Sequence, residues 1–112
     1  MAATQLNTFR TIRHTVTTSN VGIYTAPVNV ATVILNLTAS NVVTTGVSSV
    51  TAYHSRGGAD IEIVKNFAIP VKDTGILVDK KLILETDDVL KIEGTANSEL
   101  EVLLSVLETA KQ

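Results

Sequence analysis

Only a few side chains in this sequence have the type and spacing that catalysis or metal binding would need. The two histidines, His14 and His54, lie near arginines in segments that alternate like β-strands. An imidazole can bind a metal or act as a general base near neutral pH. Neither histidine, however, has a carboxylate at the spacing of a motif such as His-Glu-x-x-His. We therefore interpret both as surface imidazoles.

A short acidic group, Glu85, Asp87 and Asp88, is the other candidate for chemistry. Its oxygens could hold a hard cation. A calcium-binding loop, however, needs more oxygen ligands at regular spacing and a glycine at the bend. The pattern favours a solvated turn at the tip of a hairpin, whose aspartates accept backbone N–H bonds. Arg56-Gly57-Gly58 opens no helix that could cradle a phosphate and predicts a second hairpin tip.

Several classes of function have no support in the composition. The chain has no cysteine, which removes disulfides, thiolate zinc sites and a cysteine nucleophile. It also lacks a Gly-x-Ser-x-Gly motif, a P-loop and a dinucleotide fingerprint. We predict a protein that is not an enzyme, with no catalytic residue, cofactor or metal. The net charge of −2 and the absence of a Lys/Arg block argue against nucleic acid. The sequence has neither a signal-peptide pattern nor an apolar run of ~20 residues, so we expect no membrane partner.

The elements that must position any site are β-strands. Valine, isoleucine, leucine and threonine dominate, in short alternating segments about ten residues apart. No such segment is followed by a convincing helix. The sequence predicts an all-β fold, a single antiparallel β-sandwich of jelly-roll or Ig-like type with seven to eight short strands. We expect residues 1–20 to form an N-terminal arm or edge strand, residues 21–108 the sandwich, and residues 109–112 a polar tail.

Two of these segments differ in how clearly they alternate, the one around residues 28–41 and the one at residues 98–108. In the most strongly β segment, Val33, Leu35 and Leu37 are expected to share one face. Residues 98–108 are ambiguous, because their leucines are spaced for a helix while Leu100, Val102, Leu104 and Val106 alternate like a strand. We favour a strand there, since a sandwich needs a closing strand beside residues 89–92.

What remains is a surface for binding proteins. The N-terminal segment mixes apolar and basic residues without a clean core face, which suits either an ordinary edge strand or an arm that docks on a partner. The candidate partner-binding residues are Phe9, Arg10, Ile12, Arg13, His14, Tyr53 and Arg56.

The order of several motifs resembles the small β-sandwich structural proteins of tailed-phage virions. The motifs are Ile23-Tyr24-Thr25-Ala26-Pro27, the strand from Val33 to Asn41, Ile69-Pro70, the strand and acidic turn Leu82–Leu90, and Leu104-Ser105-Val106-Leu107-Glu108. The resemblance spans residues 21–108, and its weight lies in order and spacing, not in any single motif. The sequence departs from the family pattern after Pro27, where Val28-Asn29 stands in place of a Gly-Lys turn.

The resemblance implies a non-enzymatic virion component, made in the host bacterial cytoplasm and assembled as a symmetric homo-oligomer. Its partners would be the major capsid protein or other virion proteins. The first expectation is a capsid decoration (cement) protein that bridges major capsid subunits. The second is a neck, tail or baseplate adaptor. A third, from another class, is a glycan-binding β-sandwich that recognises a host surface, although Tyr24 and Tyr53 are a small aromatic set for binding sugars.

Overall fold

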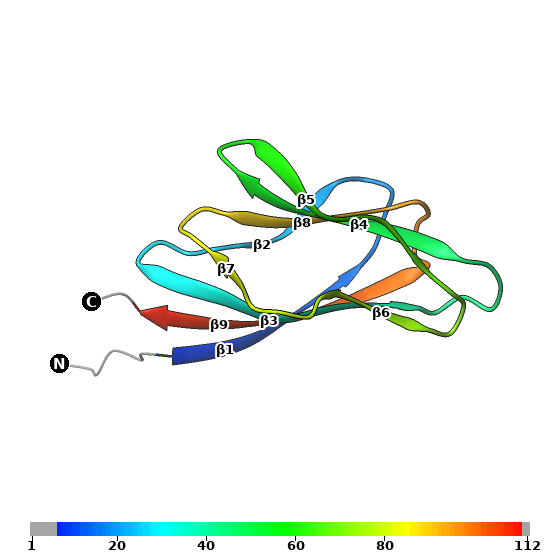
Figure 1. The fold of residues 1–112 in the computed structure, drawn as a ribbon, viewed down its shortest axis with the longest axis horizontal. Helices are drawn as coiled ribbons and strands as arrows, with labels where there is room; N and C mark the ends of the chain where they lie inside the picture. Colours follow the sequence, from blue (N-terminus) through cyan, green and yellow to red (C-terminus); the bar gives the residue numbers. More distant parts are fainter. Residues whose placement is uncertain (1–6, 111–112) are drawn as a thin grey trace.

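Two antiparallel sheets pack face to face in the computed structural model, which describes residues 7–110 (Figure 1). The predicted all-β sandwich is confirmed. The strands are β1 (Asn7–Thr15), β2 (Val21–Thr25), β3 (Val30–Asn41), β4 (Ser48–Arg56), β5 (Ala59–Ile69), β6 (Thr74–Val78), β7 (Leu82–Leu84), β8 (Val89–Gly94) and β9 (Leu100–Ala110). These nine exceed the seven to eight expected, because Asp79-Lys80-Lys81 separates two short strands, β6 and β7, that both pair with β3.

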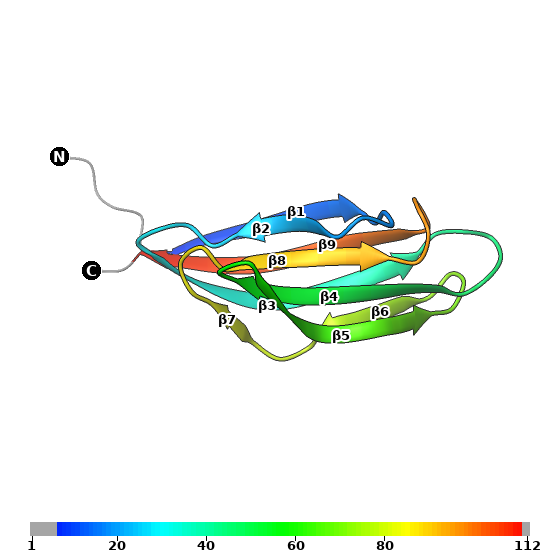
Figure 2. The same cartoon turned by 90° about the horizontal axis from the view of Figure 1, so that it is seen from above.

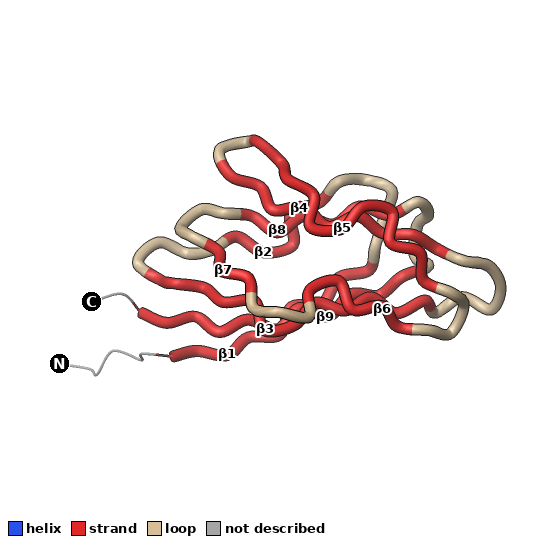
Figure 3. The backbone as a smooth tube through the Cα atoms, in the orientation of Figure 1, coloured by secondary structure: helices blue, strands red, loops and turns tan. Residues whose placement is uncertain are grey.

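The strand order identifies the jelly roll rather than the Ig-like alternative. One sheet has the order β1-β9-β3-β6, with β7 also on β3, and the other has the order β2-β8-β4-β5. Nearly every connection crosses from one sheet to the other, and only β4–β5 is a hairpin within a sheet, as the tube in Figure 3 shows. Such crossing is the double Greek key of a jelly roll. The start of β1 and the end of β9 therefore lie at one end of the sandwich (Figure 1).

The core lies between the sheets and is aliphatic. β9 shows how it forms, because Leu100, Val102, Leu104 and Val106 are all buried while the residues between them are not. A period of two puts alternate side chains on opposite faces of a strand. The expected strand over residues 98–108 is thus observed, although it lies between β1 and β3 and not beside β8. β9 also includes Thr109 and Ala110, which we had assigned to the tail; residues 111–112 lie outside the described part.

A bulge in β3 overturns the expected faces of that strand. Thr32 and Ile34 are buried, but so are Leu37 and Ala39, because the register with β9 shifts between Ile34 and Asn36. One extra residue in a strand reverses the alternation beyond it. Leu37 therefore faces the core and Val33 does not, whereas the sequence had placed them on one face.

The two predicted hairpin tips have different outcomes. Gly57 and Gly58 both have positive φ values, 61° and 83°, and join β4 to β5 as expected for a two-residue turn. The acidic turn is not a hairpin tip, because β7 pairs with β3 in one sheet while β8 pairs with β2 and β4 in the other. That turn is a corner of the sandwich, and Leu84, Leu90 and Ile92 beside it supply core side chains. In the span from residue 7 to residue 110, no helix is long and apolar enough to cross a membrane.

Candidate functional site: the β1 edge

β1 lies at one edge of the larger sheet (Figure 2). It pairs with β9 from Asn7↔Thr109 to Thr15↔Glu101, and within residues 7–110 no strand pairs with its other side. An unpaired edge presents backbone N–H and C=O groups that can accept a strand from another chain. This edge carries five of the seven residues proposed from sequence for partner binding.

The five side chains divide between two faces, as the alternation predicts. Arg10, Ile12 and His14 point toward the opposite sheet, while Phe9 and Arg13 point outward. Phe9 is 72% exposed. The outer face of β1 therefore offers an aromatic ring and a guanidinium to solvent.

The phase of the β1–β9 ladder shows which backbone donors are free. Val16 donates its N–H to the Leu100 carbonyl at 2.9 Å, one step beyond the strand. Donors alternate sides along an antiparallel ladder. The N–H groups of His14 and Ile12 therefore point to β9, and those of Arg13 and Thr11 point to the free edge.

A buried carboxylate cluster ties β1 to the opposite sheet. Glu108 of β9 is 7% exposed and accepts hydrogen bonds from Arg10 Nε, at 2.8 Å, and from the Tyr24 hydroxyl of β2. Tyr24 also contacts Thr32 of β3 through their hydroxyls, at 3.1 Å. Four strands from both sheets thus meet at one carboxylate. Nothing in the sequence indicated this cluster, because Arg10 and Tyr24 lie 98 and 84 positions away from Glu108.

The titration of this cluster follows from burial and hydrogen bonding. Burial, with the hydrogen bond to Glu108, raises the pKa of Tyr24 to about 12. Burial alone would raise the pKa of Glu108, but the hydrogen bonds from Tyr24 and Arg10 outweigh it and the pKa is lowered. The cluster therefore holds a charged carboxylate and a neutral phenol at neutral pH.

His14 lies at the far end of the same strand and makes no comparable contacts. Its Nε2 atom is buried and has no hydrogen-bond partner among the described residues. Burial lowers the pKa of His14, which favours the neutral imidazole. We had interpreted His14 as a surface imidazole, but its ring faces the inside of the sandwich rim.

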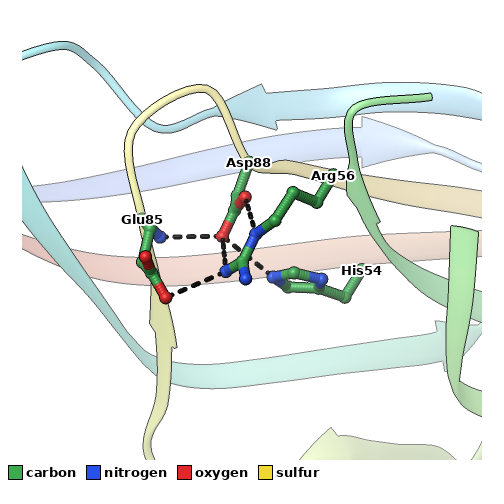
Figure 4. Close-up of polar contacts among 4 residues, drawn as sticks. All are labelled: His54, Arg56, Glu85 and Asp88. Atoms are coloured by element: carbon green, nitrogen blue, oxygen red, sulfur yellow. Dashed lines mark hydrogen bonds and ion pairs between the residues drawn. The ribbon is translucent and has the colours of Figure 1, made fainter. Parts of the chain in front are cut away.

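A second buried carboxylate lies at the acidic corner, where Asp88 is fully buried (Figure 4). Arg56 binds it with both Nε and Nη2 at 2.7 Å, His54 Nε2 lies 3.0 Å from Oδ2, and the Glu85 N–H donates to Oδ2 at 2.8 Å. Arg56 also reaches the Glu85 side chain at 3.1 Å. The paired hydrogen bonds of Arg56 lower the pKa of Asp88 well below its usual range.

This geometry corrects two expectations about the corner, the solvated turn at Asp88 and the surface position of His54. Asp88 is not part of a solvated turn, because it is buried under Arg56. A cation site is also disfavoured, since both Asp88 oxygens accept hydrogen bonds and a guanidinium occupies the space beside them. His54 is likewise not a surface imidazole, because it faces inward. The backbone of the β2–β3 loop closes the corner, with Ala26 bonded to both Asp87 and Asp88.

The structure does not bring the seven candidate residues together. Tyr53 lies on the outer face of the smaller sheet, where its hydroxyl donates to Glu93 at 2.7 Å. Arg56 belongs to the Asp88 corner. Tyr24, the other tyrosine considered for sugars, is buried with its hydroxyl on Glu108. The five β1 residues form one surface, and their role in partner binding stays a prediction.

Comparisons with known proteins find the same fold in two assemblies. A chain in the acid-stable capsid structure of Helicobacter pylori bacteriophage KHP30 has a TM-score of 0.59 at 10% identity, covering 96% of this chain and 90% of that one. A chain in the Bacillus endospore appendages, which form disulfide-linked pili, has a TM-score of 0.56 at 14% identity, covering 100% and 96%. No protein-family model matches, and no curated protein matches by sequence. At these identities the similarity is one of fold.

Proposed function

We propose that this protein is a structural component of a bacteriophage virion, acting as a capsid decoration protein that bridges and stabilises major capsid subunits. The observation that carries the proposal is the free edge of β1, with outward Phe9 and Arg13 and unpaired backbone donors. The fold shared with a chain of a phage capsid supports a role in assembly. The motif order that resembles small virion proteins points the same way.

The mechanism is strand addition. A neighbouring capsid strand pairs with the free edge of β1 through backbone hydrogen bonds. The Glu108 cluster ties β1 to β2 of the opposite sheet, so the edge strand is already ordered before it binds. Many identical small interfaces around a symmetric shell then give an avidity that one copy lacks.

The test uses expanded capsids of the encoding phage and two variants of one residue. Thr11→Pro removes a free-edge N–H but no bond to β9, so the sandwich should fold while capsid binding falls at least about tenfold. Thr11→Ala keeps the backbone donor and should bind as wild type. Wild-type protein should also raise the melting temperature of the capsids. Failure of the wild type to bind or stabilise them would show that this function is wrong.

Copy number separates decoration from other virion positions. A decoration protein is present in hundreds of copies, whereas a ring in the neck, tail or baseplate holds on the order of a dozen. Quantitative mass spectrometry of purified virions measures this number directly. A count near a dozen would move the protein to the tail or neck and leave its structural role intact.

A further inference from the structure

The outer face of the larger sheet carries an apolar row that crosses four strands. The register pairs Phe9 with Leu107, Leu107 with Val33, and Val33 with Ile83. All four lie between inward-facing residues and so point away from the core. Ile83 is 62% exposed and Phe9 more so. The row therefore runs from β1 through β9 and β3 to β7.

A second row lies four residues earlier along β9. It pairs Arg13 with Leu103, Leu103 with Thr38, and Thr38 with Ile76. Leu103 and Ile76 are about half exposed, at 51% and 53%. Between the two rows lies a middle row of small polar residues, Thr11, Ser105 and Asn36.

The outer face of the smaller sheet is different. It carries paired polar and charged side chains, with Tyr53 on Glu93, Lys91 on Asp60 at 3.4 Å, and Lys65 on Glu62 at 3.5 Å. The larger sheet's face has only Arg13 and Glu101 as charges among its described, paired residues. Large exposed apolar side chains gathered on a single face indicate an interaction surface.

We propose that this face is the interface between two copies of the chain, related by a two-fold axis that runs across the strands along the middle row. The two rows lie at equal distances from that axis, so the axis places each row on the other row of the partner. Leu107 then packs on the partner's Leu103, and Ile83 packs on the partner's Ile76. Phe9 meets the partner's Arg13, a cation–π pair.

Charge and area favour a second copy as the occupant. One cation and one anion leave the face without net charge, so two copies do not repel. β9 has 11 residues, and at ~3.3 Å per residue, with four strands ~4.8 Å apart, the face measures roughly 700 Å². A face of this outline is large enough to carry a standard interface, in which each partner buries ~800 Å² of accessible surface. Two sheets packed face to face also reproduce the packing inside the sandwich itself.

The first test is the oligomeric state of the purified protein by analytical ultracentrifugation. Wild type should be a dimer at micromolar concentration. Leu103→Glu should weaken dimerisation at least about 100-fold, because the symmetry buries the substituted side chain twice. Ile61→Glu is the matched control, since Ile61 is 70% exposed on a strand of the other sheet, and it should dimerise as wild type. A monomeric wild type, or a dimeric Leu103→Glu variant, overturns the proposal.

The second test fixes the axis and uses the absence of cysteine in the natural chain. Leu103→Cys and Leu107→Cys are prepared separately and oxidised alone and as a mixture. The mixture should form intermolecular disulfides at least about tenfold faster than either variant alone, because the axis stacks residue 103 of one copy on residue 107 of the other, whereas like positions lie roughly 13 Å apart along the strands. Faster bonding of like with like would contradict this two-fold arrangement.

The dimer does not depend on the virion role, and the two can fail separately. If wild type is monomeric and Leu103→Glu loses capsid binding, the shell and not a second copy occupies this face. If wild type dimerises but ignores capsids, the interface stands and the decoration function falls.

Discussion

The protein buries two carboxylates, Asp88 and Glu108, and surrounds them with similar hydrogen-bond partners. Each accepts a hydrogen bond from an arginine on a distant strand, and each has a ring-bearing partner, His54 for Asp88 and Tyr24 for Glu108. They differ in what they join. Asp88 also accepts a backbone N–H and locks a corner where the chain changes sheets, whereas Glu108 fastens an edge strand.

The difference shows how the same chemistry serves folding in one place and assembly in another. The Asp88 corner lies between β7 and β8, so losing it frees the chain at a crossing between sheets. The Glu108 cluster fastens β1, whose partner strand β9 remains paired with β3 on its other side. We therefore expect global effects at the corner and local effects at the edge.

Asp88→Asn should have the largest effect and cost about 2–3 kcal/mol of unfolding free energy, because a buried carboxylate loses charge-assisted hydrogen bonds from Arg56 and from the Glu85 N–H. The amide would also place N–H donors against the donors of Arg56 and Glu85. Urea denaturation measures the loss. Asp87→Asn is the control, since Asp87 is exposed and asparagine tolerates its φ of 68°. A loss below about 1 kcal/mol for Asp88→Asn would show that the corner contributes little to the global stability of the fold.

Glu108→Gln should cost less, about 1–2 kcal/mol, because glutamine still accepts a hydrogen bond from Tyr24. Its effect should be concentrated in β1. Hydrogen exchange should speed up for the amides of Ile12 and His14, which face β9, and little for those of β8. Glu101→Gln, on the same strand but exposed, should leave both unchanged. Uniform acceleration over both sheets would erase the distinction between edge and corner.

In acid, the slope of the unfolding free energy against pH should distinguish the two carboxylates. The pKa of Asp88 is lowered in the folded state, chiefly by Arg56, so the unfolded chain binds more protons and stability falls as the pH drops below about 4. Asp88→Asn should therefore lose less stability between pH 5 and pH 3 than wild type does. Glu108→Gln should flatten the same curve by a smaller amount, because burial opposes its hydrogen bonds. Equal slopes in wild type and Asp88→Asn would contradict the assignment.

Alkaline titration gives the smallest expected effect and concerns the edge alone. The folded pKa of Tyr24 is raised to about 12 from its ordinary value near 10, first by burial and then by Glu108. Its contribution to stability is complete below pH 10 and is lost as the pH rises toward 12. Tyr24→Phe should flatten the stability curve over this range. An unchanged alkaline slope would mean that the phenol ionises without disturbing the cluster.

The bulge in β3 is a feature that the sequence alone does not predict. Alternation of valine, leucine and threonine predicted the strand, and the buried residues of β9 followed the period of two without interruption. The change of face between Ile34 and Leu37 has no sequence signal, because Leu35 and Asn36 fit either phase. The bulge is set by the register with β9, about 70 residues away in the chain.

The candidate surfaces depended on tertiary structure in a similar way. The sequence named five residues of one edge strand as candidates for partner binding. It did not show that Arg10 is held by Glu108, that Asp88 is buried, or that Phe9, Leu107, Val33 and Ile83 form one row. Each of these needs the pairing of strands that are far apart in the chain, and alternation within one strand does not specify its neighbours.

The sequence by itself determined that this chain is an antiparallel β-sandwich, because its composition and its period of two depend only on local geometry and burial. Tertiary structure decided that the sandwich is a jelly roll, that the acidic turn crosses between sheets, and that the larger sheet faces solvent with apolar rows. The physical reason is that period and propensity act within a strand, whereas sheet order and side-chain clusters arise from contacts between strands.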